Sequence, residues 1–417
     1  MPSSESTTSG AAMSHVGASG AAASGVVASG GPAASWASFA RTLVTLVSSA
    51  VVGVGQAYAV IPLLPAIAGD FGTSTSAATW MVTAFSLSFA VSFLAAGPLA
   101  DRFGPRRVIL SGLAAVAVTT VAVPLASSLA TGVALRCVQG AAAAMLVPTG
   151  FAYVTSQLDP ARRPVAFSAL SSAGLASAVV LQVVAQALAP LGWRTVFLVS
   201  GAALGVVLVV AVRLLRPDDH GSASRADSVF AAVAAVPRLL ARPRLLGLYL
   251  ATAALLGGFV VVYTAIELAG PAAVDSTGAM LALRASALPA VIAAPVLTRL
   301  TASLPLRLRA TGFLGSAAVA ALALPVAAGD VVALAAVLLV FVGAIALASP
   351  AVVGLIHARA GGAIGASTAL YSASLFLGAS VGPQVVAALD EFTPTLLATA
   401  GILAAATVLV WVSTRGD

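Results

Sequence analysis

Charge is what this sequence has least of. Only 8% of its 417 residues are Asp, Glu, Lys or Arg, whereas 60% are hydrophobic, and the mean hydropathy is +1.07. An ordinary soluble domain is about one quarter charged. No soluble fold of this length buries so much apolar surface, so the composition excludes a soluble globular protein and indicates a membrane protein.

Lysine is absent and cysteine nearly so. A phosphate-binding Gly-x-x-x-x-Gly-Lys loop needs a lysine, so this absence excludes an ATP-driven pump made by the chain alone. The single cysteine, Cys137, excludes an internal disulfide and a multi-cysteine metal site. The histidines, His15, His220 and His357, have no metal-ligand spacing. We therefore expect no enzyme, no metal and no cofactor.

The basic residues are all arginines, which lie singly or in pairs between apolar runs and give a formal net charge of +7. Because they form no basic face, nucleic-acid binding is not expected. A composition rich in Ala, Gly and Val, with arginine as its only cation besides histidine, favours a bacterial source. Residues 1–38 are rich in Ser, Gly and Ala and lack the basic segment of a secretory signal, so we expect a disordered cytoplasmic tail.

Long apolar runs divide the rest of the chain. A helix that crosses a bilayer needs roughly 20 apolar residues, and twelve runs have about this length. They cover residues 42–66, 77–99, 107–127, 130–156, 165–189, 193–215, 245–267, 277–298, 308–328, 331–356, 363–388 and 393–413. We therefore predict an all-α membrane protein with twelve transmembrane helices.

The positions of the arginines set the expected orientation. If the amino terminus is cytoplasmic, every arginine except Arg136, Arg194 and Arg284 falls on the cytoplasmic side. Loops that stay in the cytoplasm carry such an excess of arginine. We therefore expect a multi-pass protein of the bacterial inner membrane with both termini in the cytoplasm.

A charged hairpin follows the second run and recurs in the second half. Gly97–Arg107 reads GPLADRFGPRR, and Ala294–Arg299 (APVLTR) takes the same place after the eighth run, with Thr298 where Asp101 stands. This duplication predicts two six-helix bundles with pseudo-two-fold symmetry, and the alternative is chance similarity of short apolar strings. The predicted divisions are a tail at 1–38, a first bundle at 39–215, a connector at 216–244 and a second bundle at 245–414.

These motifs resemble the major facilitator superfamily, and most of all its twelve-helix drug:proton antiporters. The family pattern Gly-x-Leu-Ala-Asp-Arg-x-Gly-x-Arg-Arg matches Gly97–Arg107, and other family strings resemble Trp80–Leu87, Arg136–Gly140 and Gly192–Phe197. The resemblance implies the major facilitator fold and a proton-coupled secondary transporter that exports a small lipophilic drug-like or metabolite molecule by alternating access. Its partners would be the lipid bilayer, the substrate and protons, and it would act as a monomer driven by the proton gradient.

One departure leaves the direction of transport open. The antiporters usually carry Gly-Pro-x-x-Gly-Gly in the fifth helix, where this chain has Ser177–Gln186 (SAVVLQVVAQ). The alternative is therefore an uptake permease for a sugar or metabolite. A ligand sensor that moves nothing is a further alternative, but the sequence shows no output module for it.

The hairpin is the predicted conformational latch. Its residues are Gly97, Asp101, Arg102, Gly104, Arg106 and Arg107. We expect Gly97 to allow close helix approach and Gly104 to permit a turn with positive φ. Asp101 would accept hydrogen bonds from a helix amino terminus or an arginine. The alternative is that the arginines only satisfy the positive-inside preference.

Four polar residues within the spans are candidates for proton coupling: Arg136, Gln139, Glu267 and Arg284. Arg136 lies one turn from Gln139, and the resemblance implies that it takes part in proton coupling. Its alternative is an arginine that reaches to the outer surface. Glu267 and Arg284 would form an ion pair across a short hairpin with Glu267 as the proton acceptor, unless Glu267 is an ordinary surface residue.

The substrate path is expected to use the few polar and aromatic residues inside the spans. These are Gln56, Tyr58, Gln182, Gln186, Tyr249, Tyr263 and Tyr371. Gln182 and Gln186 are four residues apart and share a helical face. A path so poor in charge suits a neutral or lipophilic molecule. The alternative for the tyrosines is packing, or anchoring at the membrane interface.

Overall fold

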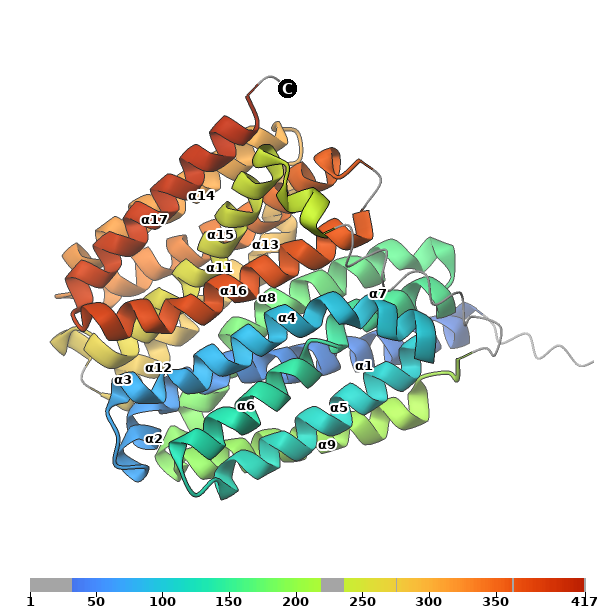
Figure 1. Ribbon diagram of the computed structural model, residues 1–417, viewed down its shortest axis with the longest axis horizontal. Helices are drawn as coiled ribbons and strands as arrows, with labels where there is room; N and C mark the ends of the chain where they lie inside the picture. The colour runs from blue at the N-terminus through green and yellow to red at the C-terminus, as the bar shows by residue number, and fades with distance from the viewer. Residues whose placement is uncertain (1–31, 219–235, 275, 362–363, 416–417) are drawn as a thin grey trace, which may run out of the picture. The chain divides into compact units, whose positions relative to one another are not determined.

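The computed structural model describes residues 32–218, 236–274, 276–361 and 364–415, and every regular element in these ranges is a helix (Figure 1). Residues 1–31 of the predicted tail lie outside the described residues. Residues 219–235 of the connector predicted at 216–244 also lie outside them. Contacts between residues make Phe39–Asp417 one compact unit. The division of this unit into two bundles at the expected boundaries stays a prediction.

Apolar length determines the helices. Among the described residues, eleven helices are long and apolar enough to cross a membrane, and two segments inclined by 44°, Pro160–Gly174 and Ala176–Leu191, form one more candidate span. The eleven are Ser38–Asp70, Thr75–Phe103, Pro105–Leu125, Leu129–Gln157, Trp193–Leu214, Pro243–Ala269, Thr277–Leu300, Leu306–Ala327, Val331–Arg359, Ile364–Leu389 and Phe392–Ser413. They coincide with the predicted runs to within a few residues at each end, so the predicted all-α membrane fold is confirmed.

Four spans are divided by a short break. These spans are α1 (Pro32–Ala59) with η1 (Ile61–Leu63) and α2 (Leu64–Asp70), α3 (Thr75–Ala78) with α4 (Trp80–Phe103), α6 (Leu129–Ala143) with α7 (Leu146–Gln157), and α12 (Thr277–Ala285) with α13 (Leu288–Leu300). Pro62, Pro65 and Pro289 each stand in the first turn after a break. A proline lacks the N–H that would continue the preceding helix, so it marks where a new helical segment begins.

Each of the other spans is built on one main helix, and the bent span is built on α8. They are α5 (Pro105–Ala122) with η2 (Val123–Leu125), α8 (Arg163–Leu188) between η3 (Pro160–Arg162) and η4 (Ala189–Leu191), α9 (Trp193–Leu214), α11 (Pro243–Ala269), α14 (Leu306–Ala327), α15 (Val331–Arg359), α16 (Ile364–Leu389) and α17 (Phe392–Ser413). A short η5 (Ala272–Val274) follows α11. We refer to the elements up to α9 as the first half and to those from α11 onward as the second half.

Helices pack mainly within their own half. In the first half α4 contacts α6 and α5 contacts α9, and in the second half α11 contacts α16 and α17. The halves meet where α4 lies beside α16 (Figure 1) and where α8 contacts α12 and α13. Within the second half, a Cβ atom at Gly378 would overlap the backbone of Ala253, so a glycine is needed for α11 and α16 to approach so closely.

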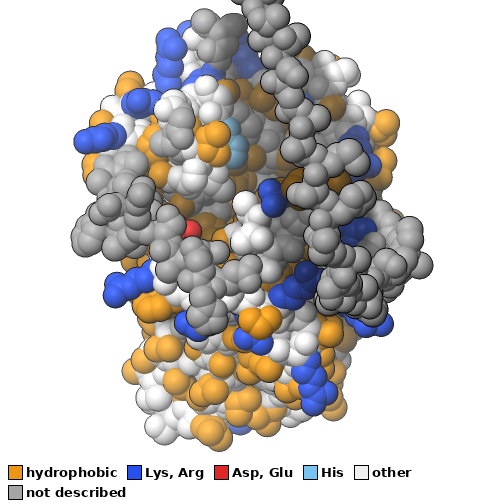
Figure 2. Space-filling model, turned by 90° about the vertical axis from the view of Figure 1, so that its right-hand side faces the viewer, with side chains coloured by type: hydrophobic (Ala, Val, Ile, Leu, Met, Phe, Trp, Pro, Cys, Tyr) orange, Lys and Arg blue, Asp and Glu red, His pale blue; other side chains and the backbone are white. Residues whose placement is uncertain are grey.

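The two ends of the spans differ in charge. Arg102, Arg106 and Arg107 lie where α4 ends and α5 begins, and further arginines lie at the same end of α9, α11 and α15. Figure 2 shows many arginine side chains and little acidic surface on this face. We call it the arginine-rich end, and the other the arginine-poor end.

Candidate functional site

A buried arginine joins the two halves at the arginine-poor end. Arg284 lies two turns into α12, which begins at the N-cap Ser276, and its side chain is 1% exposed. Its Nη2 contacts Oε2 of Glu267 in α11 at 2.5 Å. From the first half, Gln186 accepts a hydrogen bond from Nε at 3.1 Å and Gln182 accepts one from Nη1. We call Gln182, Gln186, Glu267 and Arg284 the charged seam.

The charged seam satisfies a cation that would otherwise be very costly to bury. An unpaired charge at membrane depth costs several kcal/mol, and a carboxylate together with amide oxygens replaces the water that the guanidinium loses. The expected ion pair between Glu267 and Arg284 is therefore present, and Glu267, at 10% side-chain exposure, is not an ordinary surface residue. Gln182 and Gln186 do share a helical face as expected, but in this state that face holds Arg284.

Two buried hydroxyls of α11, four and three residues before Glu267, have no hydrogen-bond partner among the described residues. The hydroxyl of Tyr263 and Oγ1 of Thr264 are both enclosed, on residues that are at most 1% exposed. The ring of Tyr263 lies 5.7 Å from the guanidinium of Arg284. Buried polar atoms in proteins nearly always have a partner, so these two hydroxyls are exceptional.

A second set of hydrogen bonds joins the halves at the same end without any charge. Thr83 of α4 donates from Oγ1 to the backbone carbonyl of Ser380 in α16 at 2.8 Å. The amide of Gln384 in α16 donates to Oγ1 of Thr83 at 2.9 Å and to Oγ1 of Thr79 at 3.2 Å. We call Thr79, Thr83, Ser380 and Gln384 the neutral seam. Because both seams lie near the arginine-poor end, the halves are closed together there.

Aromatic rings from both halves form a continuous row in the interior. Phe89 of α4 stacks on Phe376 of α16 at 3.8 Å between ring centroids, and Phe376 lies 6.5 Å from Tyr58 of α1. Tyr58 meets Phe259 of α11 edge-on at 6.1 Å, and Phe259 lies 4.6 Å from Tyr263. The expected path residues Tyr58 and Tyr263 therefore belong to one row that spans the contact between the halves. Its phenylalanines were not expected from the sequence.

Two of the remaining path candidates form hydrogen bonds only inside their own half. Gln56 donates to the backbone carbonyl of Val52, one turn earlier in α1, at 3.1 Å. The hydroxyl of Tyr371 in α16 is hydrogen-bonded to the hydroxyl of Ser349 in α15. The hydroxyl of the third, Tyr249, is buried without a partner among the described residues. None of the three is part of the aromatic row.

Arg136 is enclosed in the first half. Its Nε donates to the carbonyl of Met81 at 2.9 Å, its Nη1 donates to Gln139 at 2.6 Å, and the guanidinium lies 4.4 Å from the ring centre of Phe85. Gln139 in turn donates to Thr120 of α5 at 2.6 Å. With 0% exposure, Arg136 does not reach to the outer surface, so that alternative is wrong. Its Nη2 has no partner among the described residues.

The hairpin of the predicted latch contains the expected turn. Gly104 ends α4 with φ 88°, and Pro105 begins α5. The backbone amides of Arg106 and Arg107 donate to the two carboxylate oxygens of Asp218 at 3.0 and 3.3 Å. An acid at the first turn of a helix is favourable because the free amides and the helix dipole are positive there. Asp218, which the sequence patterns had not indicated, thus ties the end of the first half to this hairpin.

The other latch residues lie in different surroundings. Arg106 also donates from its guanidinium to the carbonyls of Leu215 and Val212, both at 2.9 Å. Asp101 and Arg102 are exposed. The close helix approach expected at Gly97 is not found, because nothing lies within 4 Å of the position that its Cβ would occupy.

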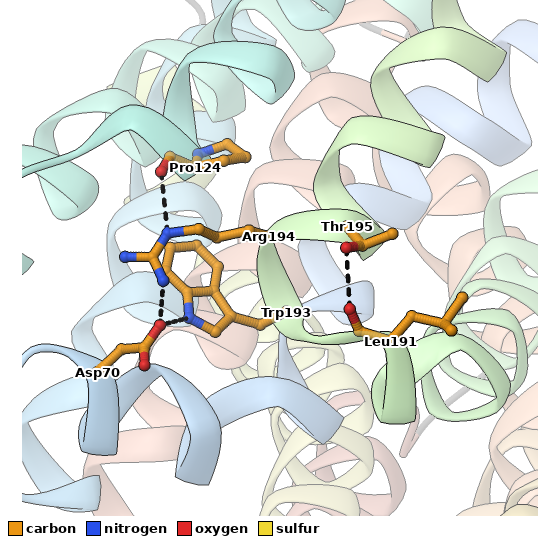
Figure 3. Close-up of polar contacts among 6 residues, drawn as sticks. All are labelled: Asp70, Pro124, Leu191, Trp193, Arg194 and Thr195. Atoms are coloured by element: carbon orange, nitrogen blue, oxygen red, sulfur yellow. Dashed lines mark hydrogen bonds and ion pairs between the residues drawn. The ribbon is translucent and has the colours of Figure 1, made fainter.

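A third polar cluster lies at the arginine-poor end but stays within the first half (Figure 3). Arg194, the second residue of α9, forms an ion pair with Asp70 at the end of α2, and its Nε donates to the carbonyl of Pro124 at 3.2 Å. The indole N–H of Trp193 donates to the same carboxylate oxygen of Asp70 at 2.6 Å. Both charged side chains are almost half exposed. This clamp fixes three connections of the first half to one another.

Comparison with protein families decides the relationship that the hairpin suggested. A family model described as Major Facilitator Superfamily matches residues 45–383. The chain belongs to this superfamily. Two solved structures support the fold: a D-xylose-proton symporter and a peptide transporter POT in complex with sulfate, each with a TM-score of 0.68 over 89% of this chain. The match covers 97% of the symporter chain at 15% sequence identity and 94% of the peptide transporter chain at 16% sequence identity.

Curated relatives of the superfamily match a shorter part of the chain. The probable actinorhodin transporter of Streptomyces coelicolor is 30% identical over 37% of this chain and 27% of its own length. The tetracenomycin C resistance and export protein of Streptomyces glaucescens is 31% identical over 40% of this chain and 30% of its own length. The cephamycin export protein of Amycolatopsis lactamdurans is 36% identical over 36% of this chain and 32% of its own length. The chain thus spans about a third or less of each of these relatives.

Proposed function

We propose that this superfamily member is a proton-driven secondary transporter that exports a small lipophilic molecule by alternating access. The observation that carries the proposal is the charged seam, in which one buried guanidinium bonds to a carboxylate of its own half and to two amides of the other half. Such a group links the charge of Glu267 to the contact between the halves. No cofactor is needed, because the proton gradient supplies the energy.

The order of steps follows from the partners of Arg284. With Glu267 ionised, the ion pair satisfies Arg284 within the second half, so α12 can separate from Gln182 and Gln186 without leaving a bare charge. When Glu267 takes up a proton, the ion pair is lost and the amides of α8 become the principal acceptors of Arg284. Protonation at the arginine-poor end therefore favours closure of that end, which is the sense that proton-driven export requires.

The orientation rests on the arginines. A cytoplasmic arginine-rich end satisfies the positive-inside preference, and it places both termini in the cytoplasm and the two seams toward the outside of a bacterial inner membrane. The state described here is then closed to the outside. Substrate would enter from the cytoplasm or the inner leaflet and leave when the seams open.

The chemistry of the interior favours an apolar, aromatic or weakly polar substrate. The aromatic row offers stacking surface and no net charge between the halves, and the free hydroxyl of Tyr263 offers one hydrogen bond. The names of three relatives, a probable actinorhodin transporter, a tetracenomycin C resistance and export protein and a cephamycin export protein, are consistent with export of such a molecule.

An uptake permease is the second candidate, because the fifth helix carries Ser177–Gln186 in place of the antiporter signature. Proteoliposomes distinguish the two directions. Protein is reconstituted with a pH-sensitive dye in the lumen, and ethidium, tetracycline and D-xylose are supplied outside. Export by antiport predicts that a probe accumulates in vesicles with an acidic lumen while the lumen becomes more alkaline.

Glu267→Gln is the matched variant for this experiment. It keeps the shape of the side chain and removes the site for the proton, so we expect it to abolish the coupled pH change. Asp70→Asn, which alters an acid of the first-half clamp, is the control and should behave like the unmodified protein. Accumulation of a probe only when the solution outside the vesicles is acidic would show uptake. A pH change like that of the unmodified protein in Glu267→Gln would show that Glu267 has no part in the mechanism.

A further inference from the structure

Three arginines converge on a cavity at the arginine-rich end of the second half. The cavity has a volume of about 460 Å³ and lies where α11 begins and α15 ends. It is lined by Arg242, Arg244 and Arg359, with Pro243, Leu245 and Ala241 completing the wall. Ligand pockets in proteins begin at about 300 Å³, so the space is large enough for a small polar group.

The arginines are held near one another despite their like charge. Arg242 donates from Nη1 to the backbone carbonyl of Arg359 at 3.3 Å, and Arg359 donates from its own Nη1 to the carbonyl of Leu355 at 3.0 Å. Arg244 is near enough to Arg359 to repel it electrostatically. Within the described ranges, neither Arg242 nor Arg244 forms an ion pair with a carboxylate. The first turn of α11 adds the positive end of its helix dipole and has no side-chain cap.

Positive charge at the cytoplasmic ends of spans does not by itself explain this grouping. Arg213 and Arg299 are exposed single arginines in the last turns of α9 and α13, and they satisfy the same preference without lining this cavity. In the cavity, like charges are brought together around an open space. Such an arrangement becomes favourable when an anion occupies that space.

We infer that this cavity binds the phosphate group of an anionic phospholipid of the cytoplasmic leaflet. Guanidinium groups match the oxygens of a phosphate in two-pronged hydrogen bonds, and basic pockets between helices at this membrane surface suit lipid headgroups. Leu245 and Pro243 give the wall an apolar side. The inference rests on the proposed orientation of the spans, but not on what the protein transports or in which direction.

The test measures binding of one lipid to the intact protein. Purified full chain, freed of lipid in detergent micelles, is titrated with dioleoylphosphatidylglycerol, and bound lipid is counted by native mass spectrometry. Arg242→Gln combined with Arg244→Gln removes two exposed charges. An arginine near a membrane surface changes the affinity for anionic lipid about fivefold, so we expect binding to weaken about 25-fold. Arg213→Gln combined with Arg216→Gln removes the same amount of charge outside the cavity. This control should change the affinity for the lipid less than twofold.

Three comparisons make the outcome decisive. The single variant Arg244→Gln should weaken binding about fivefold, and it serves if the double variant does not fold. Dioleoylphosphatidylcholine should bind far more weakly than phosphatidylglycerol, because its choline cancels the phosphate charge. Equal weakening by both double variants, or equal binding of the two lipids, would overturn the inference. If inorganic phosphate displaces the lipid at the concentration where the lipid itself binds, the site serves a soluble anion and the lipid assignment is wrong.

Discussion

The neutral and charged seams close the same end of the molecule with different chemistry. Thr83 and Gln384 join α4 to α16 with hydroxyl and amide groups alone, whereas Arg284 joins α12 to α8 and also binds Glu267. In the order of spans, each seam pairs the second helix of one half with the fifth helix of the other. The two corresponding helix pairs therefore form different kinds of contact. Only the charged seam contains a side chain that can gain or lose a proton.

This difference assigns separate tasks to the two seams. Neutral hydrogen bonds between membrane helices stabilise a contact by about 0.6 kcal/mol each, and they do so at every pH. In the proposed mechanism, the charged seam makes the same closure depend on whether Glu267 is ionised. We expect changes at the charged seam to alter the coupling to protons, and changes at the neutral seam to alter only how long the end stays closed.

The largest effect is expected for Arg284→Met. It leaves Glu267 as a buried carboxylate without its partner, which costs about 3 kcal/mol when one member of a buried ion pair is removed. Thermal unfolding in detergent and proton-driven flux should both fall, with flux lost almost completely. Adding Glu267→Gln should restore much of the stability but none of the coupled flux. If the double variant regained coupled flux, neither residue would be the coupling group.

Glu267→Gln alone should have the next largest effect. The neutral amide still bonds to Arg284, so we expect the protein to fold, to exchange substrate across the membrane and to lose at least about 100-fold of its proton-driven accumulation. The experiment compares exchange at equal pH with accumulation under a gradient, across pH 5 to 8. Exchange by the variant should not vary with pH in this range, and a pH dependence like that of the unmodified protein would contradict the role of Glu267.

Gln384→Ala tests the neutral seam. It removes two hydrogen bonds between the halves, about 1 kcal/mol in total, so the population of the state open at the arginine-poor end should rise about fivefold. Spin labels on either side of that end report the distance distribution. The ratio of protons to substrate should stay unchanged, and an altered ratio would show that the two seams do not have separate tasks.

Asp70→Asn should have the smallest effect of the four. Its clamp lies at the same end and contains an ion pair, but all its partners belong to the first half and both charges are almost half exposed. Exposed ion pairs contribute little, so flux should change less than about twofold and its pH dependence not at all. A large loss of coupling in this variant would mean that charge at this end matters wherever it stands.

The sequence is enough to predict the helices and a part of the charged seam. Apolar runs determine where each span lies, because a bilayer requires about the same length of each helix. Glu267 and Arg284 stand on consecutive spans joined by a short connection, so their ion pair could be foreseen. The positive φ at Gly104 could also be foreseen, since a glycine ends α4 immediately before a proline.

Contacts between distant spans are what the sequence does not reveal. Nothing near Gln182 or Gln186 indicates that α8 lies against α12, and nothing near Gln384 indicates α4. Asp218 was missed for the same reason, since it follows α9 yet binds the first turn of α5. Phe85, Phe89 and Phe93 do repeat at four-residue intervals, which is a signal for one helical face, but their partner Phe376 depends on how the halves meet.

The close contact at Gly378 limits how the two seams can open. Because the backbones of α11 and α16 are in close contact there, we expect the two helices to move together. Since α11 carries Glu267 and α16 carries Gln384, a shared movement of these helices would reach both seams. We therefore expect the two seams to open together, and a larger side chain at position 378 to push α11 and α16 apart and so uncouple their opening.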